Sequence, residues 1–291
     1  MRNDVPYDSI FKPGLLQGQT VIVTGGGSGI GRCTAHEAAA LGAHVVLTGR
    51  KPDKLEAVTA EIVADGGSAD WEAFDIRDEA RVIEAIAAIV ARHGRVHGLV
   101  NNAGGQFPAR IEDISHKGWD AVVRNNLTGG FLVAREVFKR SMKEHGGSIV
   151  NITADNWFGM PGMAHSGAAR AGMVNFTETA ALEWSRYGVR VNAVAPGVIA
   201  SSGIDTYEGP VRQAMKQRYL EVPLHRMGTE AETSSAIVYL LSQGAAYVTG
   251  AVLRVDGGAP LARMNWQMPA HQRAPEYQGF HRYVRPKLLD E

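Results

Sequence analysis

The chain has very little cysteine, no excess charge of either sign and no long apolar run. Its single cysteine, Cys33, excludes an internal disulfide framework and is expected to be a small packing residue on the first helix. Thirty basic residues balance thirty acidic ones, which argues against nucleic acid or an anionic membrane as the main partner. No apolar stretch approaches the roughly eighteen residues of a membrane span, and the polar first residues show no secretory signal. We therefore expect a cytoplasmic protein without membrane association.

Glycine, in contrast, is abundant, and it is concentrated where a strand-like run changes into a helical one. Residues 21–31 read Val-Ile-Val-Thr-Gly-Gly-Gly-Ser-Gly-Ile-Gly and lead into an alanine-rich stretch. Glycines allow a sharp turn and a close approach of the backbone to a pyrophosphate, and the following helix directs its free N–H groups and positive dipole end at the phosphates. The predicted dinucleotide-binding turn comprises Gly25, Ser28, Gly29, Ile30 and Gly31.

The end of the next predicted strand, residues 43–48, indicates which dinucleotide is bound. Sites specific for NAD usually hold a carboxylate there, about twenty residues past the glycines, for the ribose hydroxyls. This sequence has Gly49, which leaves space, and Arg50, whose planar cation suits a phosphate. We predict NADP(H) as the cofactor, the alternative being that Arg50 and Lys51 form a solvated charge pair in a loop.

Strand and helix patterns alternate along most of the chain and predict one α/β domain over residues 18–260. Its expected fold is a Rossmann-type, doubly wound parallel sheet of about seven strands with helices on both faces. Further strands are expected at 69–74, 98–101, 148–152, 189–194 and 251–255, and helices at 30–41, 78–93, 118–144 and 162–186.

Three segments lie outside this regular alternation. Residues 1–17 form an N-terminal arm, and residues 200–228 mix polar and apolar residues in a way that we interpret as a substrate lid beyond the strand ends. The tail, residues 261–291, is rich in Pro, Arg and aromatic residues. We expect it to be either disordered or draped over a neighbouring subunit, with Trp266 and the residues after it covering that neighbour.

Five motifs in a fixed order connect these elements to a known family. They are Thr24-Gly25-x-x-x-Gly29-x-Gly31, Asp75-Ile76, Asn101-Asn102-Ala103-Gly104, Asn126-Leu127 and Pro196-Gly197. In this set the chain resembles the short-chain dehydrogenase/reductase family. The resemblance implies that Asp75 and Ile76 border the adenine and that Asn102, Ala103 and Gly104 line the cofactor. It also implies that Pro196, Gly197, Val198 and Ile199 pass by the nicotinamide.

The chain departs from this family where the carbonyl chemistry is performed. Carbonyl-reducing members usually carry a serine after the fifth strand and a Tyr-x-x-x-Lys on the next helix. Here Ala154 replaces the serine, Ser166 the tyrosine and Arg170 the lysine. Serine is a poor acid and arginine stays charged, so standard carbonyl reduction is not expected.

Similar replacements occur in two branches of the family. The stretches 102–107, 114–119 and 165–172 resemble peroxisomal trans-2-enoyl-CoA reductases, and this similarity covers nearly the whole chain up to about residue 260. A second resemblance, which includes Gly279-Phe280-His281-Arg282, is to bacterial citronellol/citronellal dehydrogenases. The first resemblance predicts an NADP-dependent oxidoreductase that reduces the double bond of a trans-2-enoyl-CoA. The alternatives are an acyclic terpenoid alcohol or aldehyde dehydrogenase and a catalytically silent NADP-binding subunit.

Reduction of an enoyl thioester requires a proton source and donors directed at the thioester oxygen. The resemblance gives Arg170 the role of the family lysine beside the cofactor ribose, and gives Asn126 a bound water. Asp155, fifteen residues before Arg170, corresponds to the acid of dienoyl-CoA reductases, although it is equally consistent with an exposed loop aspartate. Ser166 and His165 are second candidates for orienting the thioester oxygen, and no metal site is expected.

A homotetramer is expected from the small residues on the helices 118–144 and 162–186. These allow close helix contact across a two-fold axis, and the family resemblance implies the same interface. The small residues are Gly129, Gly130, Ala134, Gly167, Ala168 and Ala171.

Overall fold

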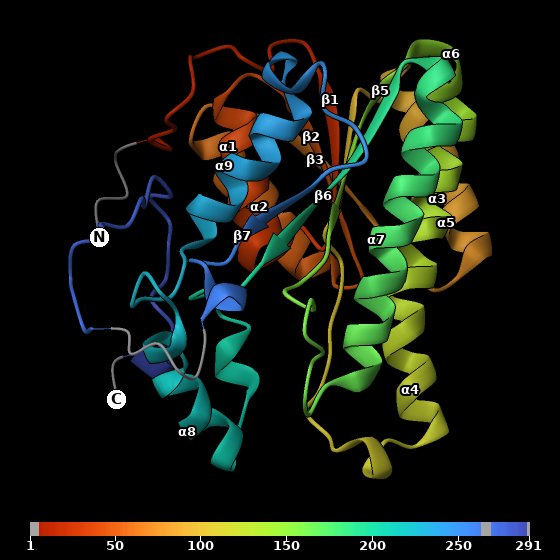
Figure 1. Cartoon of the computed structure of the whole chain (residues 1–291). Coiled ribbons are helices and arrows are strands. Elements are labelled where there is room, and N and C mark those ends of the chain that lie inside the picture. Colours follow the sequence, from red (N-terminus) through yellow and green to blue (C-terminus); the bar gives the residue numbers. More distant parts are fainter. Residues whose placement is uncertain (1–5, 263–268, 290–291) are drawn as a thin grey trace.

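The computed structural model describes residues 6–262 and 269–289 and shows a seven-stranded parallel sheet between two layers of helices (Figure 1). The strand order is β3-β2-β1-β4-β5-β6-β7, which confirms the predicted fold class. The strands are β1 (Thr20–Thr24), β2 (His44–Gly49), β3 (Ser68–Ala73), β4 (Gly98–Asn101), β5 (Gly147–Ile152), β6 (Val189–Pro196) and β7 (Val252–Val255). Because the order reverses between β1 and β4, the carboxyl ends of these two strands flank a crevice suited to a dinucleotide.

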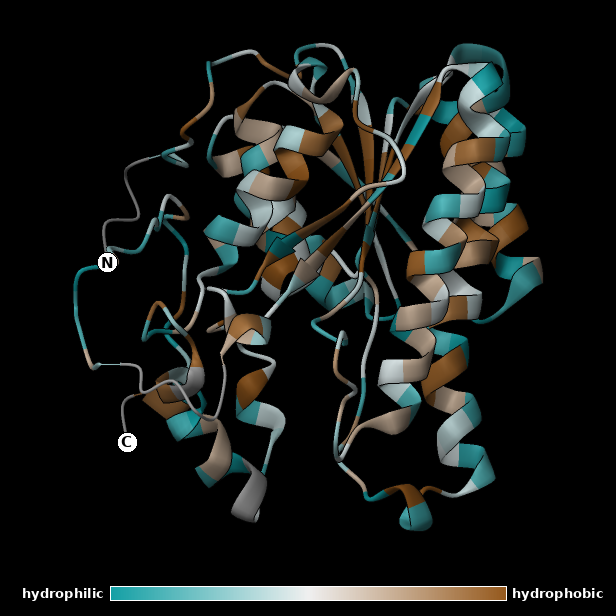
Figure 2. Ribbon diagram, in the orientation of Figure 1, coloured by the Kyte–Doolittle hydropathy of each residue, from teal (hydrophilic) through white to brown (hydrophobic). Residues whose placement is uncertain are grey.

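Each face of the sheet is covered by its own group of helices. One group is α1 (Gly29–Ala40), α2 (Pro52–Ala64) and α9 (Glu230–Leu241); the other is α3 (Glu79–His93), α5 (Gly129–Val137) and α7 (Ala164–Trp184). The apolar strand side chains pack against both groups and form two separate cores, and the strands are accordingly apolar in Figure 2. Burial on both faces is why the inner strands read as short apolar runs, whereas the edge strands β3 and β7 are only partly buried.

The helix expected at 118–144 is longer and less regular than predicted. It runs from α4 (His116–Val123) through α5 to α6 (Lys143–His145), with π-helical turns at Arg124–Thr128 and Phe138–Met142. A π-turn inserts one residue, shifts the following side chains around the axis and is frequent at functional sites. The first of these turns contains Asn126.

Residues 200–228, called the 200–228 segment below, lie beyond the carboxyl ends of β6 and β7. They contain the short helical turn Ile204–Thr206, α8 (Gly209–Gln217) and the turn Arg218–Glu221. The two ends of the segment meet, because Ala200 N donates to Gly228 O and Gly228 N donates to Val198 O. Among the described residues, no helix is long and apolar enough to cross a bilayer.

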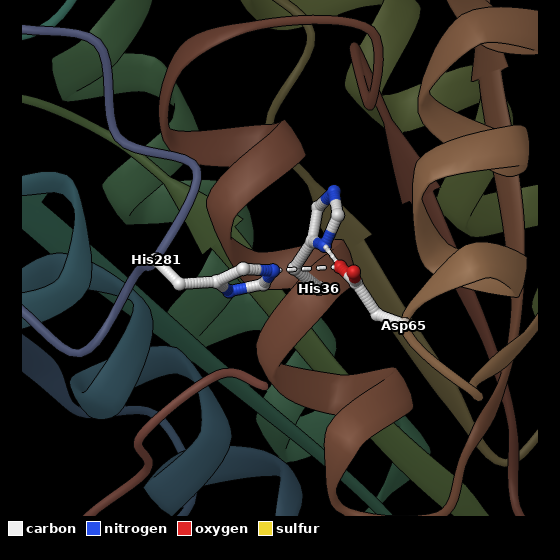
Figure 3. A group of neighbouring side chains, drawn as sticks. All are labelled: His36, Asp65 and His281. Atoms are coloured by element: carbon white, nitrogen blue, oxygen red, sulfur yellow. Dashed lines mark hydrogen bonds and ion pairs between the residues drawn. The ribbon is translucent and has the colours of Figure 1, made fainter. Parts of the chain in front are cut away.

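The tail, of which residues 269–289 are described, packs against its own chain. Phe280 is 2% exposed and lies against the rings of Tyr7 and His36, at centroid distances of 5.8 and 5.0 Å. His281 binds Asp65, which follows α2, as Figure 3 shows, and Arg282 binds the same carboxylate. The expectation of a disordered or neighbour-covering tail is therefore wrong for these residues, because their aromatic and charged side chains find partners on α1 and α2. Trp266 lies outside the described residues.

The cluster of His36, Asp65 and His281 in Figure 3 has the composition of a metal site, but its partners favour a structural role. Arg282 donates to both oxygens of Asp65, and Glu61, which receives a hydrogen bond from Arg32, lies 3.1 Å from His36 Nε2. The carboxylates are thus already compensated by arginines, and the cluster joins the tail to α1 and α2.

Candidate active site

The glycine turn between β1 and α1 has the open geometry that a phosphate site requires. Gly25 and Gly29 adopt φ angles of 66° and 58°, a region that favours glycine. A Cβ atom at Gly31 would lie 2.4 Å from Asn102 Nδ2 and 2.5 Å from Gly25 O, so this position has no space for a side chain. Ser28 precedes the helix in an extended conformation without capping it, which leaves the first N–H groups of α1 available to an anion.

Thr24 joins this turn to the loop that follows β4. Its hydroxyl oxygen accepts hydrogen bonds from Asn102 N and Ala103 N, at 3.0 and 2.9 Å. In return, Asn102 Nδ2 donates to Thr24 O at 2.9 Å. The two loops that flank the crevice therefore form one rigid unit, with the backbone of residues 102–104 on its wall.

Charged residues gather at the ends of β2 and β3, where the adenosine half of a dinucleotide lies in such folds. Asp75 is held by Arg77, whose guanidinium donates to both carboxylate oxygens at 2.6 to 3.1 Å. These bonds, with a smaller contribution from the Arg50 charge, hold the pKa of Asp75 below its usual value. Arg50 is exposed and forms no ion pair within the described chain, whereas the side chain of Ile76 is buried against Gly129.

Arg170 on α7 reaches the loop after β4. Its Nη1 donates to Ile152 O at 2.5 Å, and a Cβ atom at Gly104 would lie 2.7 Å from its Nη2. Burial lowers its pKa to about 10, so the guanidinium remains charged at neutral pH. Its Nε is buried without a hydrogen-bond partner among the described residues. A donor left free beside this crevice fits a bound group that carries acceptor oxygens, as a dinucleotide ribose does.

Asn126 fastens the same loop from the first π-turn. Its Nδ2 donates to Gly105 O and Val122 O, and its Oδ1 accepts from Gly105 N at 3.2 Å. The side chain is 3% exposed. Both amide hydrogens are thus used, and only one oxygen lone pair remains for the water that the resemblance implies. The structure therefore gives Asn126 an additional, positioning role that sequence alone did not indicate.

Ser166 and His165 are both buried at the start of α7. The Ser166 hydroxyl donates to Gln106 Oε1 at 2.5 Å, while its backbone N–H donates to His165 Nδ1 at 2.9 Å. His165 lies edge-on to Phe107, with the ring centroids 4.6 Å apart. Because its Nδ1 accepts the backbone N–H of Ser166, His165 stabilises the first turn of α7. Ser166 cannot donate elsewhere without breaking its bond to Gln106.

Asp155 lies beside the predicted nicotinamide segment. Its backbone N–H donates to Pro196 O at 3.2 Å, which places it where β5 and β6 end. Burial, together with the neighbouring Asp256, raises the pKa of the Asp155 carboxyl. The side chain is half-buried rather than exposed, and the raised pKa is the property that a general acid requires.

The segment Pro196 to Ile199 is fixed on both sides. Gly197 N donates to Val255 O at 2.9 Å, and a Cβ atom at Gly197 would lie 2.8 Å from Asp256 Cα. Val198 O accepts from Gly228 N, and Ile199 pairs with Gly228 in an isolated bridge. Next to this segment a cavity of about 490 Å³ extends to the 200–228 segment, with Val198, Val222, Leu224, Arg226, Arg254 and Asp256 among its walls.

Three residues at the site were not found from the sequence. Gln106 binds Ser166 and also donates from Nε2 to the hydroxyl of Tyr207, at 3.3 Å. Glu230, at the start of α9, is buried near Gly29 of the phosphate turn. Gln106 stands inside a recognisable motif, but nothing in the sequence indicates its partners. Tyr207 lies in a segment without periodicity, and Glu230 has the pattern of an ordinary first-turn acidic residue.

Comparison with known proteins identifies the family of this chain. Residues 25–260 match the family model described as enoyl-(acyl carrier protein) reductase. A probable 2,4-dienoyl-CoA reductase of Bacillus subtilis is 36% identical over 84% of this chain and 97% of its own, and a 3-oxoacyl-[acyl-carrier-protein] reductase of Thermotoga maritima is 34% identical over 84% and 98%. The solved structure of a citronellol catabolism dehydrogenase of Pseudomonas aeruginosa is 62% identical, with a TM-score of 0.79 over 87% of this chain and 99% of that one. The chain is an oxidoreductase that belongs to the short-chain dehydrogenase/reductase family, whose members use nicotinamide cofactors.

Proposed function

We propose that the protein uses NADPH to reduce the 2,3 double bond of an α,β-unsaturated acyl-CoA with a lipid-like acyl chain. The observation that carries this proposal is the state of Ser166. Ser166 occupies the position of the tyrosine of carbonyl-reducing relatives, and its buried hydroxyl donates its hydrogen bond to Gln106. The acid that a simple ketone or aldehyde needs beside its oxygen is therefore not supplied by α7.

The remaining residues suit conjugate reduction of a thioester. Bound NADPH would supply a hydride to the β-carbon of the substrate. Arg170, charged and directed at the loop after β4, contributes positive potential where negative charge collects on the thioester oxygen. Asp155, whose pKa is raised, is placed to return a proton to the α-carbon. In the cavity beside Val198, the side chains of Val198, Val222 and Leu224 would contact the acyl chain, and the 200–228 segment serves as its lid.

Preference for NADP(H) rests on the charges at the ends of β2 and β3. Asp75 is neutralised by the bidentate hold of Arg77, and the exposed Arg50 has no carboxylate partner in the described chain. The free charge next to the adenosine ribose is therefore the cation of Arg50 rather than a carboxylate.

A terpenoid alcohol or aldehyde dehydrogenase is the second candidate. It is favoured by the 62% identity with a protein described as a citronellol catabolism dehydrogenase. The two activities can belong to neighbouring steps, because a terpenoid acid is also degraded as a CoA thioester. A silent NADP-binding subunit is a third possibility, which the oxidoreductase relatives do not favour.

We also propose a cytoplasmic homotetramer, although only some of the residues expected at its interface are available for it. Gly129 and Gly130 pack inside the subunit, where a Cβ atom would meet Ile76 at 2.6 Å and Met173 at 2.7 Å, and Ala134 is buried as well. These residues cannot line an interface. The exposed face of α7 with Ala168, Ala171 and Leu182 remains available for it.

The test is oxidation of NADPH by the pure protein with a panel of substrates. The panel contains trans-2-enoyl-CoAs of increasing length, an α,β-unsaturated terpenoid acyl-CoA, citronellal and simple ketones. Faster turnover of the enoyl-CoAs supports the proposal. Faster turnover of citronellal supports the second candidate, and NADPH binding without any turnover supports the silent subunit.

A further inference from the structure

Three side chains from distant parts of the chain are joined at the position of the missing family tyrosine. They are Ser166 at the start of α7, Gln106 in the loop after β4 and Tyr207 in the 200–228 segment. Ser166 Oγ lies 2.5 Å from Gln106 Oε1, and Gln106 Nε2 lies 3.3 Å from the Tyr207 hydroxyl. The side chain of Gln106 therefore bridges the phenol of Tyr207 and the hydroxyl of Ser166.

The direction of these hydrogen bonds determines what Tyr207 can do. A glutamine amide has a carbonyl oxygen that accepts and an NH₂ group that only donates. Since the oxygen accepts from Ser166, the nitrogen donates to Tyr207, whose oxygen must then be the acceptor. The phenolic hydrogen of Tyr207 remains free to donate to a further group.

Gln106 and Ser166 connect Tyr207 to the residues of the proposed reaction centre. Ser166 precedes Arg170 by four residues and so lies one turn away on the same face of α7. Gln106 follows Gly104 by two residues, and Gly104 lies against the guanidinium of Arg170. Tyr207 therefore reaches the group of residues to which we assign the thioester.

The tail holds the turn that carries Tyr207. The Tyr207 N–H donates to Ile204 O, and Ile204 is buried together with Met227 and Leu288. The carboxylate of Asp205 accepts from the backbone N–H groups of Lys287 and Leu288, at 3.2 and 3.0 Å. The phenol is thus presented by a packed turn, with the tail behind it.

We propose that Tyr207 is a catalytic residue whose hydroxyl donates a hydrogen bond to the carbonyl oxygen of the substrate. This proposal rests on the proposed function. Hydride addition to the β-carbon moves the π-electron pair of the double bond towards the thioester and forms an enolate, whose oxygen Tyr207 stabilises. The enolate then collapses as the α-carbon takes one proton, for which Asp155 is the assigned donor. Tyr207 keeps its own proton throughout, and Gln106 is its positioning residue.

The experiment compares Tyr207→Phe with the wild type in steady-state assays on the best enoyl-CoA. Loss of one donor to a developing oxyanion lowers kcat by about 10²-fold. The Kd of NADPH, measured by fluorescence titration, should not change, since Tyr207 has no role in cofactor binding. Tyr219→Phe, in the same segment and 37% exposed, is the matched control and should retain wild-type kcat.

A double-mutant cycle tests the positioning role of Gln106. Gln106→Leu should lower kcat when Tyr207 is present but should have almost no further effect on kcat in the Tyr207→Phe background. The reason is that Gln106 contributes to kcat through the phenol of Tyr207. Additive losses in the two variants would contradict this coupling. Equal losses in Tyr207→Phe and Tyr219→Phe would mean that the segment, not the hydroxyl, is required, and would overturn the proposal.

Failure of this proposal is distinguishable from failure of the proposed function. If the wild type reduces enoyl-CoAs and Tyr207→Phe is equally active, Tyr207 is not catalytic and the proposed function stands. If the wild type reduces only citronellal or ketones and Tyr207→Phe loses that activity, the proposed function fails and the donor role stands. A wild type that binds NADPH and turns over no substrate in the panel refutes both.

Discussion

Glu230 provides a direct test of how the phosphate side of the crevice is built. It is the first residue of α9, 6% exposed, and no described residue donates a hydrogen bond to its carboxylate. Its Oε1 would lie 3.9 Å from a Cβ atom built on Gly29. Burial raises the pKa of this carboxyl from 4.5 to about 7, and the nearby positive charge of Arg32 only partly opposes this.

The raised pKa makes the free energy of unfolding depend on pH. Between about 4.5 and 7 the folded protein keeps the proton on Glu230 while the unfolded chain has lost it, so stability decreases as pH rises through this range. The difference between the two pKa values corresponds to about 3 kcal/mol. Glu230→Gln carries no titrating proton, and it should therefore exceed the wild type in stability by about 3 kcal/mol at pH 8 but match it near pH 4.

Urea unfolding followed by circular dichroism at fixed protein concentration measures this difference. The wild type, Glu230→Gln and the control Glu56→Gln, at an exposed position of α2, are compared at a series of pH values. Only Glu230→Gln should diverge from the wild type as pH rises. Parallel curves for all three proteins would show that Glu230 ionises normally and would refute the reasoning. Phosphate binding near Gly29 should raise the pKa of Glu230 further, so NADPH should bind the wild type more weakly above pH 7 than it binds the variant.

The other predictions concern cofactor, proton transfer and assembly. Arg50→Asp should shift the ratio of Kd values towards NAD(H), because it replaces a phosphate-binding cation by a ribose-binding carboxylate, and equal affinity of the wild type for NADH and NADPH would contradict this. Asp155→Asn should lower kcat by about 10²-fold at unchanged NADPH affinity, and full activity would exclude it as the proton donor. Asn126→Ala should lower kcat by about the same factor, because it releases the loop at Gly105, whereas Ser166→Ala should lower kcat by a smaller factor. Light scattering at micromolar concentration should report a tetramer, and a monomer there would contradict the assembly.

The parts of the site that the sequence predicted are those encoded within a few residues. The turn from Gly25 to Gly31 needs only its own glycines and the strand and helix on either side, and the structure has it as predicted. The parallel sheet follows equally from the alternation of short apolar runs and helical patterns. Even here the π-turn around Asn126 was not predicted, because one inserted residue hardly changes the apolar pattern.

The parts that could not be predicted depend on which distant residues meet. Gln106 and Tyr207 are separated by 101 residues and have no common pattern. Small residues are ambiguous for a similar reason: Gly129 and Gly130 allow close packing, but the sequence does not state whether the neighbour is the same subunit or another one. The sequence predicts a tail that is disordered or covers a neighbour, because nothing near His281 and Arg282 indicates that their partner is Asp65, more than 200 residues away.

The tail also has a consequence for the order of folding. The Tyr277 hydroxyl donates to Asp8 O across 269 residues, and His281 meets Asp65 across 216, so these contacts close some of the longest loops in the chain. Loop closure of that length is entropically costly, and the surface that the tail binds exists only after β1, β2 and their helices have assembled. Refolding should therefore restore the sheet before the turn that carries Asp205. A population with native secondary structure but without a working catalytic centre is expected at intermediate times.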